Sequence, residues 1–106
     1  MQTHELQFLK PGDHTGLTTT VRRGDKWLKQ ARIGDRVEIK EAGTNHVLRT
    51  AQITGLLYLP FDQLPDAIIR LQHSRETEDR AGLLKAMERA YPGFQPSEDV
   101  TVVFYQ

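Results

Sequence analysis

The sequence predicts an α+β domain, with a mixed β-barrel of about five to six strands and two helices packed against it. Three observations support this class. Segments rich in β-branched or alternating apolar residues fill the first half of the chain and its C-terminus, and two helical patterns lie between them. Gly55 interrupts a long β-rich stretch, where a bulge can curve a sheet toward closure.

The chain is expected to form one domain over residues 1–106. Its length suffices for a single hydrophobic core and is too short for two domains of ordinary size, and 38% of its residues are apolar. No repeat, low-complexity tract or linker-like run divides it.

Five segments have the composition of β-strands. We expect strands at residues 5–9, 18–22, 36–40, 46–59 and 100–105. The first ends at Lys10-Pro11-Gly12-Asp13, because proline cannot donate to a strand ladder. The last is rich in valine and aromatic residues, which favours a central position in the sheet.

Two of these strands have informative faces. Thr18, Thr20 and Arg22 alternate and therefore share one polar face, which we interpret as functional. In residues 36–40, which follow a turn at Gly34-Asp35, the same alternation points Val37 and Ile39 inward.

The helical patterns lie in the second half of the chain. Residues 61–73 predict a short helix with Pro65 at its first position. A second helix is expected to begin at a Thr77 cap and to end at Pro92-Gly93, with an apolar stripe between them. Residues 24–32 are expected to form a loop.

Composition excludes several classes of protein. The chain has no cysteine, so disulfides, thiolate metal sites and cysteine nucleophiles are absent. The first residues resemble neither a signal peptide nor a membrane span, and we expect a cytoplasmic protein. The four histidines lack metal-ligand spacing, and no phosphate loop, dinucleotide motif or nucleophile elbow occurs, so we expect no metal and no cofactor.

Charge is balanced overall but unevenly distributed. Lysine plus arginine and aspartate plus glutamate each number 14, so the net charge gives no reason for strong non-specific binding of nucleic acid. Residues 22–40, however, contain seven basic residues and three acidic ones. This segment predicts a positive edge, which either binds phosphate or is a solvated surface. Within it, Trp27 either stacks on a base or packs in the core.

The order of elements and three motifs together resemble the ASCH family of the PUA-like superfold, over nearly the whole chain. The first family motif runs approximately Gly-x-Lys-x-x-Thr-x-Arg, and Thr20 and Arg22 fit its last two fixed positions. Gly34-Asp35 fits a family turn, and the second helix ends in Tyr91-Pro92-Gly93. The resemblance implies a pocket for nucleic acid or a nucleoside.

Small bacterial relatives in this family are amidohydrolases that deacylate N(4)-acetylcytidine. Their C-terminal half is similar to residues 76–93 without a gap, which places Glu76 at their catalytic glutamate. They use a lysine, a threonine and a glutamate, but here Leu17 stands at the lysine position. Replacement of that amine by Lys10 or Lys26 is an open alternative, whereas arginine is a poor base.

Each candidate also has a structural interpretation. Thr20 can satisfy a backbone group, Glu76 can favour a helix dipole, and Arg22 can form an ion pair. We nevertheless expect a cleft that binds RNA or a nucleoside, with catalysis by Thr20 and Glu76 as the alternative and a protein-interaction domain as a third hypothesis. The residues predicted to line it are Thr18, Thr20, Arg22, Arg23, Lys26, Trp27 and Glu76.

Overall fold

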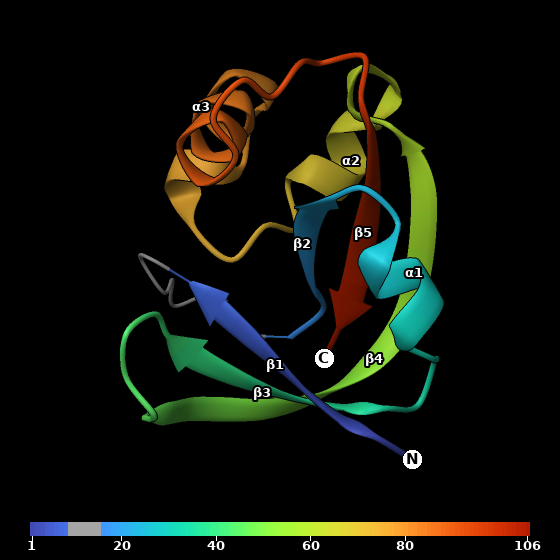
Figure 1. Ribbon diagram of the computed structural model, residues 1–106, viewed down its shortest axis with the longest axis vertical. Coiled ribbons are helices and arrows are strands. Elements are labelled where there is room, and N and C mark those ends of the chain that lie inside the picture. Colours follow the sequence, from blue (N-terminus) through green and yellow to red (C-terminus); the bar gives the residue numbers. More distant parts are fainter. Residues whose placement is uncertain (9–15) are drawn as a thin grey trace.

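The computed structural model describes residues 1–8 and 16–106, and Figure 1 shows their arrangement. The expected end of the first strand at Lys10-Pro11-Gly12-Asp13 lies outside the described residues. The strands are β1 (Thr3–Phe8), β2 (Thr18–Arg23), β3 (Arg36–Glu41), β4 (Val47–Pro60) and β5 (Asp99–Tyr105). The helices are α1 (Lys26–Gln30), α2 (Asp66–Ile69) and α3 (Arg80–Ala90), with 3-10 turns η1 (Phe61–Gln63) and η2 (Arg75–Thr77).

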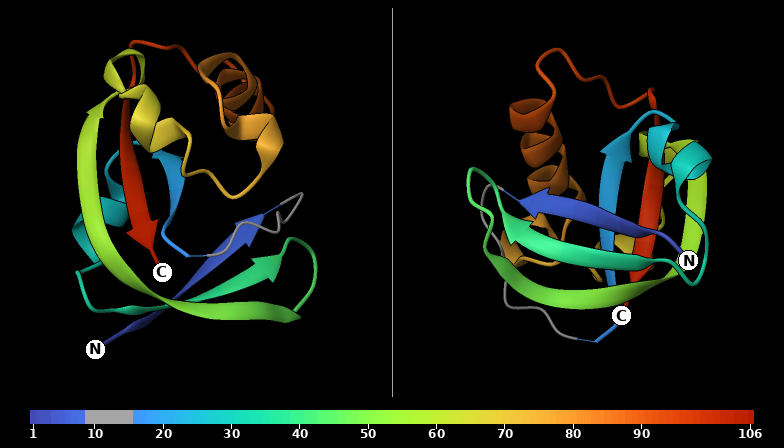
Figure 2. Two further views of the ribbon diagram at one scale, coloured as in Figure 1. Left: turned by 180° about the vertical axis from the view of Figure 1, so that it is seen from behind. Right: turned by 60° about the horizontal axis from the view of Figure 1, so that its bottom comes forward.

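All five strands belong to one mixed sheet in the order β1-β3-β4-β5-β2. The β1 and β3 strands are parallel, and the other neighbours are antiparallel. The long β4 strand pairs with β3 through its first half and with β5 through its second half. It therefore bends the sheet into two parts that cross each other (Figure 2).

The predicted irregularity at Gly55 is confirmed. The register between β4 and β5 shifts between Ile53 and Gly55, where β4 changes partners. A Cβ at Gly55 would lie 3.2 Å from the Phe104 side chain, so the absent side chain also allows that ring to pack closely over β4.

The predicted barrel is not confirmed, because the described strands leave β1 and β2 as the two edges of the sheet. The outer edge of β2 is occupied by another segment. The Thr19 amide donates to the Leu71 carbonyl at 2.9 Å, and Thr19 forms an isolated parallel bridge with Gln72. The segment that follows α2 thus takes a position at which β1 would have closed a barrel.

The strand predictions inside the sheet are confirmed. Val37 and Ile39 are buried in β3, while Arg36 and Glu41 at its ends are exposed. The β5 strand lies between β4 and β2, and its alternating side chains contribute to two separate hydrophobic cores. Val102 joins the core under the helices, and Val103 joins the core between the two parts of the sheet.

The loop prediction for residues 24–32 is wrong, because α1 forms there. Asp25 is its N-cap residue and forms an ion pair at 3.1 Å with Lys29, four residues later. The helix buries none of its residues fully. Its Trp27 ring lies 5.5 Å from the His4 ring and packs against the core that contains Leu6. Such tertiary packing stabilises a five-residue helix that a local pattern does not predict.

The helices in the second half differ in detail from the prediction. Residues 61–73 begin with the turn η1 and continue into the short helix α2, and Pro65 is the N-cap of α2 and not its first residue. Asp79, and not Thr77, caps α3, because its Oδ1 accepts from the Gly82 amide at 2.7 Å. Thr77 instead ends η2 and donates its hydroxyl to the Ser74 carbonyl at 3.1 Å.

Candidate functional site

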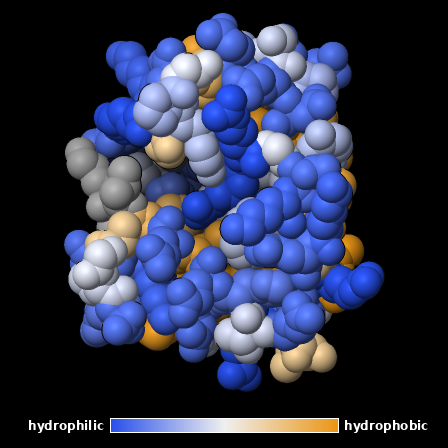
Figure 3. Space-filling view, viewed as in Figure 1, coloured by the Kyte–Doolittle hydropathy of each residue, from blue (hydrophilic) through white to orange (hydrophobic). Residues whose placement is uncertain are grey.

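A cleft of about 290 Å³ lies between the end of β1, β2, residues 72–77 and α3. The face shown in Figure 1 is hollowed between the part that carries α3 and the N-terminal strands below it (Figure 3). Apolar side chains such as Phe8, Leu83 and Met87 form much of the wall, and a few polar side chains stand among them. This combination is typical of small-molecule sites.

Arg22 is the central polar group of the β2 wall. Its Nε donates to the Thr20 hydroxyl at 3.2 Å, its Nη2 lies 3.4 Å from the Gln7 carbonyl oxygen, and its guanidinium lies 5.1 Å from the centre of the Phe8 ring. These contacts join β2 to β1 and hold the guanidinium over an aromatic face. Thr20 is 3% exposed and therefore presents only a small part of its surface to the cleft.

Burial lowers the pKa of Arg22, and interactions with Tyr91 and Tyr105 act in the opposite direction. Desolvation disfavours the charged form of any base, but a guanidinium stays protonated in proteins. The cleft thus contains a partly desolvated permanent cation.

Residues 72–77 form the opposite rim and are attached to β2 and α3. Gln72 is 1% exposed and donates from Nε2 to the Thr19 hydroxyl at 3.2 Å. Glu76 lies in η2, where its amide donates to the Ser74 hydroxyl at 3.2 Å. A Cβ at Gly82 would lie only 1.8 Å from the Glu76 carbonyl oxygen, so glycine allows α3 to pack directly on the turn that carries Glu76.

Aromatic and cationic side chains complete the walls. The Phe8 and His73 rings lie 4.1 Å apart at an angle of 44°. Tyr91, directly after α3, and Arg89, in its last turn, also line the cleft. The site thus offers ring faces, hydrogen-bonding groups and charges of both signs within one small volume.

Three of the residues selected from the sequence line this cleft: Thr20, Arg22 and Glu76. They are brought together although more than fifty positions separate β2 from η2. Thr18 is fully buried and donates to the Gly16 carbonyl at 3.0 Å, so it lies outside the cleft wall.

The predicted basic loop lies elsewhere. Arg23 forms an ion pair with Glu98 at 2.7 Å, Lys26 is exposed on α1, and Trp27 packs against His4. None of the three lines the cleft. Arg23 follows Arg22 on a strand, so the two side chains leave opposite faces. The α1 helix lies on the other side of β2 from α3 (Figure 1).

Leu17, which stands where the resembling amidohydrolases carry a lysine, has an exposed side chain. Leu17 is 39% exposed, and no lysine is among the cleft residues that the structure describes. Lys26, one expected substitute, is on α1, and Lys10, the other, lies outside the described residues.

Sequence reasoning did not select Phe8, Gln72, His73, Arg89 or Tyr91 as site residues. Phe8 and Gln72 enter the cleft only through the crossing of β1 and the pairing of residue 72 with β2. Arg89 and Tyr91 carried one usable signal, since they follow Glu76 on the segment that resembles the amidohydrolases.

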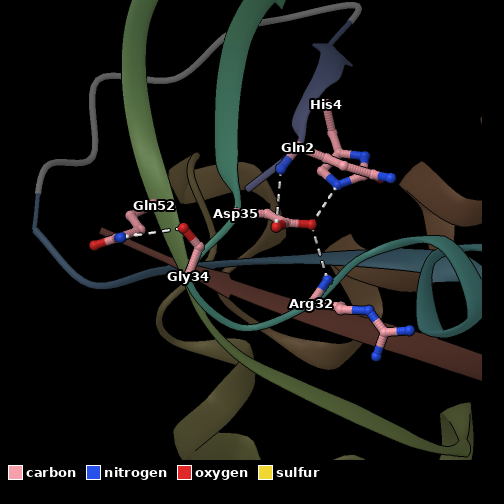
Figure 4. Close-up of polar contacts among 6 residues, drawn as sticks. All are labelled: Gln2, His4, Arg32, Gly34, Asp35 and Gln52. Carbon is pink, nitrogen blue, oxygen red and sulfur yellow. Dashed lines mark hydrogen bonds and ion pairs between the residues drawn. The ribbon is translucent and has the colours of Figure 1, made fainter.

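The Gly34-Asp35 turn has a structural role away from the cleft (Figure 4). The buried Asp35 carboxylate accepts from the Gln2 amide at 3.2 Å, the Arg32 amide at 3.1 Å and His4 Nε2 at 2.8 Å. These bonds attach β1 to the turn before β3. The hydrogen bond from His4 is the main reason that the pKa of Asp35 lies below its ordinary value.

Among the residues described, no three histidine, aspartate or glutamate side chains are grouped to hold a metal ion. Over the same residues, none of the helices is both long enough and apolar enough to cross a bilayer.

The described residues form a compact α+β unit with a bent mixed sheet. Its fold is that of an ASCH domain. It is similar to the crystal structure of an ASCH domain from Lactobacillus crispatus, with a TM-score of 0.74 over 99% of this chain and 79% of that chain, at 8% identity. No family model and no curated protein matches the sequence.

Proposed function

We propose that the cleft binds a nucleobase, presented either by a free nucleoside or by an unstacked nucleotide of single-stranded RNA. The observation that carries this proposal is the meeting of Thr20, Arg22 and Glu76 in one cleft lined by aromatic and apolar side chains. The fold of an ASCH domain is consistent with it.

The size and chemistry of the cleft support a ligand of this kind. Its volume of about 290 Å³ is at the small end of the range for small-molecule sites. Phe8, His73 and Tyr91 offer ring surfaces, which favour flat ligands. The Glu76 carboxylate can accept from an exocyclic amine such as that of cytosine, and Arg22 can donate to base oxygens and nitrogens.

The test is calorimetric titration of the protein with cytidine and with a short single-stranded RNA. Arg22→Ala is expected to weaken binding by about tenfold or more, since it removes charge-assisted donors from the cleft. Arg23→Ala is the matched control, because this neighbour is the same residue type on the same strand and pairs with Glu98. Equal effects of the two substitutions, or no binding by the wild type, would contradict the proposal.

The sequence also predicted RNA contacts from Lys26 and Trp27. Lys26→Ala tests whether RNA extends beyond the cleft to α1. A loss of RNA affinity with unchanged cytidine affinity would support that extended path, and its salt dependence would decrease with the lost phosphate contact.

The second candidate is an amidohydrolase that deacylates N(4)-acetylcytidine or a related nucleoside. The observation in its favour is that Thr20 and Glu76 line the same cleft. The Arg22 Nε–H donates to Thr20 Oγ1, which favours negative charge on that oxygen, but a guanidinium does not accept the proton. Glu76 would therefore take the proton from Thr20 or from water, and would return it to the leaving amine nitrogen.

Turnover of N(4)-acetylcytidine, followed by absorbance, decides between the two candidates. Hydrolysis by the wild type that is lost in Glu76→Gln, with Glu78→Gln as the matched control, would establish the enzyme. Leu17→Lys restores the family pattern, and a gain of turnover would show that the position still reaches the reacting atoms. Absence of turnover in all four proteins favours binding alone.

A further inference from the structure

The charges of the cleft identify a feature of its ligand beyond the base. Among the described residues, Arg22 and Arg89 line it from β2 and α3, against one carboxylate, that of Glu76. Two permanent cations against one anion give the cleft a positive balance, in a protein whose net charge is zero.

Some basic residues elsewhere in the described chain form ion pairs with carboxylates, whereas others, such as Lys26 and Arg36, form none. Arg23 pairs with Glu98 at 2.7 Å, Lys40 with Glu5 at 2.6 Å and Lys29 with Asp25 at 3.1 Å. Over the same residues, no carboxylate forms an ion pair with Arg22 or Arg89. Within the described part of the chain, neither cleft arginine is therefore in ion-pair contact with a carboxylate.

Arg22 is the more informative of the two. Its protein partners are the oxygens of Thr20 and Gln7 and the hydroxyl of Tyr91, which together leave some of the five N–H donors of the guanidinium for a ligand. Burial of a cation without an opposite charge is costly, as the lowered pKa of Arg22 also indicates. An anionic group on the ligand would use the remaining donors and provide the opposite charge.

We infer that the ligand is a nucleoside monophosphate, with its phosphate held between Arg22 and Arg89 and its base against the aromatic wall. This inference rests on the proposed nucleobase site. Arg89 is exposed in the last turn of α3, where an arginine can reach a phosphate at the mouth of the cleft. The carboxylate of Glu76 repels phosphate, and it is therefore assigned to the amine edge of the base.

The experiment compares cytidine, cytidine 5′-monophosphate and inorganic phosphate by calorimetry at one pH and one low salt concentration. The monophosphate is expected to bind the wild type at least about tenfold more tightly than cytidine. Arg89→Gln is expected to lower the affinity for the monophosphate much more than the affinity for cytidine, and so to remove most of this difference. Lys85→Gln is the matched control, since it removes the same charge from an exposed position of α3 that does not line the cleft.

The outcomes separate this inference from the proposed function. Equal affinity for cytidine and its monophosphate, unaffected by Arg89→Gln, would overturn the phosphate site and leave the nucleobase site intact. Binding of inorganic phosphate that is lost in Arg89→Gln, without any binding of cytidine, would support the anion site and contradict the nucleobase site. Binding of none of the three ligands would overturn both. An equal loss of monophosphate affinity in Lys85→Gln would show that the total positive charge of α3, and not a contact from Arg89, causes the tighter binding. That result would overturn the inference.

Discussion

Replacement of Gly82 by alanine tests how the fold positions Glu76. The new Cβ would lie 1.8 Å from the Glu76 carbonyl oxygen and 3.0 Å from its carbonyl carbon. The obstructing atoms belong to the backbone and cannot rotate away. The start of α3 and the η2 turn must therefore separate by more than about 1 Å to reach an ordinary non-bonded distance.

The free energy of unfolding is expected to fall by about 1–2 kcal/mol. Overpacking against a rigid neighbour costs about 2–3 kcal/mol, and the better helix propensity of alanine returns up to about 1 kcal/mol. For a domain of this size, the change lowers Tm by roughly 5–10 °C. Because η2 moves with its neighbour, ligand affinity at the cleft should fall as well.

The assay is urea unfolding followed by the fluorescence of Trp27, with ligand titration of the same variant. Ala81→Gly is the matched control, since it makes the reverse exchange at an exposed neighbouring position and should cost about 0.5–1 kcal/mol through helix propensity alone. A Gly82→Ala protein as stable as the wild type, or more stable, would refute the close approach of α3 to Glu76.

Three further predictions concern the cores and the titrating groups. Met87→Ala removes a side chain that is 3% exposed and should destabilise the protein by about 2–5 kcal/mol in urea unfolding, whereas Lys85→Ala on the exposed face of α3 should change stability by less than about 0.5 kcal/mol. The pKa of Asp35 is lowered in the folded protein, so its ionised form stabilises the fold above the ordinary aspartate pKa. This contribution is lost as pH falls through the folded-state pKa. Asp35→Asn should therefore lower Tm at pH 7 and make Tm depend less on pH in the acidic range. Burial raises the pKa of Tyr105 to about 12, so ultraviolet titration should show a late phase that Tyr105→Phe removes. The associated stability should be present below pH ~10 and lost as pH rises toward 12.

The sheet was predictable because its strands carry their own signals. The alternation around Val37 and Ile39, the β-branched run at residues 18–20 and the valine-rich C-terminus each indicate strand and burial locally. Gly55 also carried a local signal, because a lone glycine inside a β-rich stretch often marks a bulge or a bend.

The errors arose where contacts distant in sequence decide the structure. The α1 helix depends on the packing of Trp27 against His4, and the open sheet depends on the pairing of Thr19 with residues 71 and 72. Asp79 and Thr77 are both good caps by type, and only the geometry of η2 selects Asp79.

The candidate site was predictable in part. The family motifs located Thr20, Arg22 and Glu76, which the fold brings into one cleft. The basic count over residues 22–40 placed Arg23 and Lys26 with them, although a strand sends Arg22 and Arg23 to opposite faces. Phe8 and Gln72 have no local signal, because only the crossing of β1 and the pairing of residue 72 with β2 bring them into the cleft.

At the proposed site, the ligand lies between β2, η2 and α3 and does not lie on α1. Amide chemical-shift mapping during titration with cytidine and cytidine 5′-monophosphate tests this location most directly. We expect the largest shifts at Thr20, Arg22, Glu76 and Tyr91, with the Trp27 indole signal unmoved. Shifts centred on Trp27 and the rest of α1, or no shifts with either ligand, would contradict this expectation.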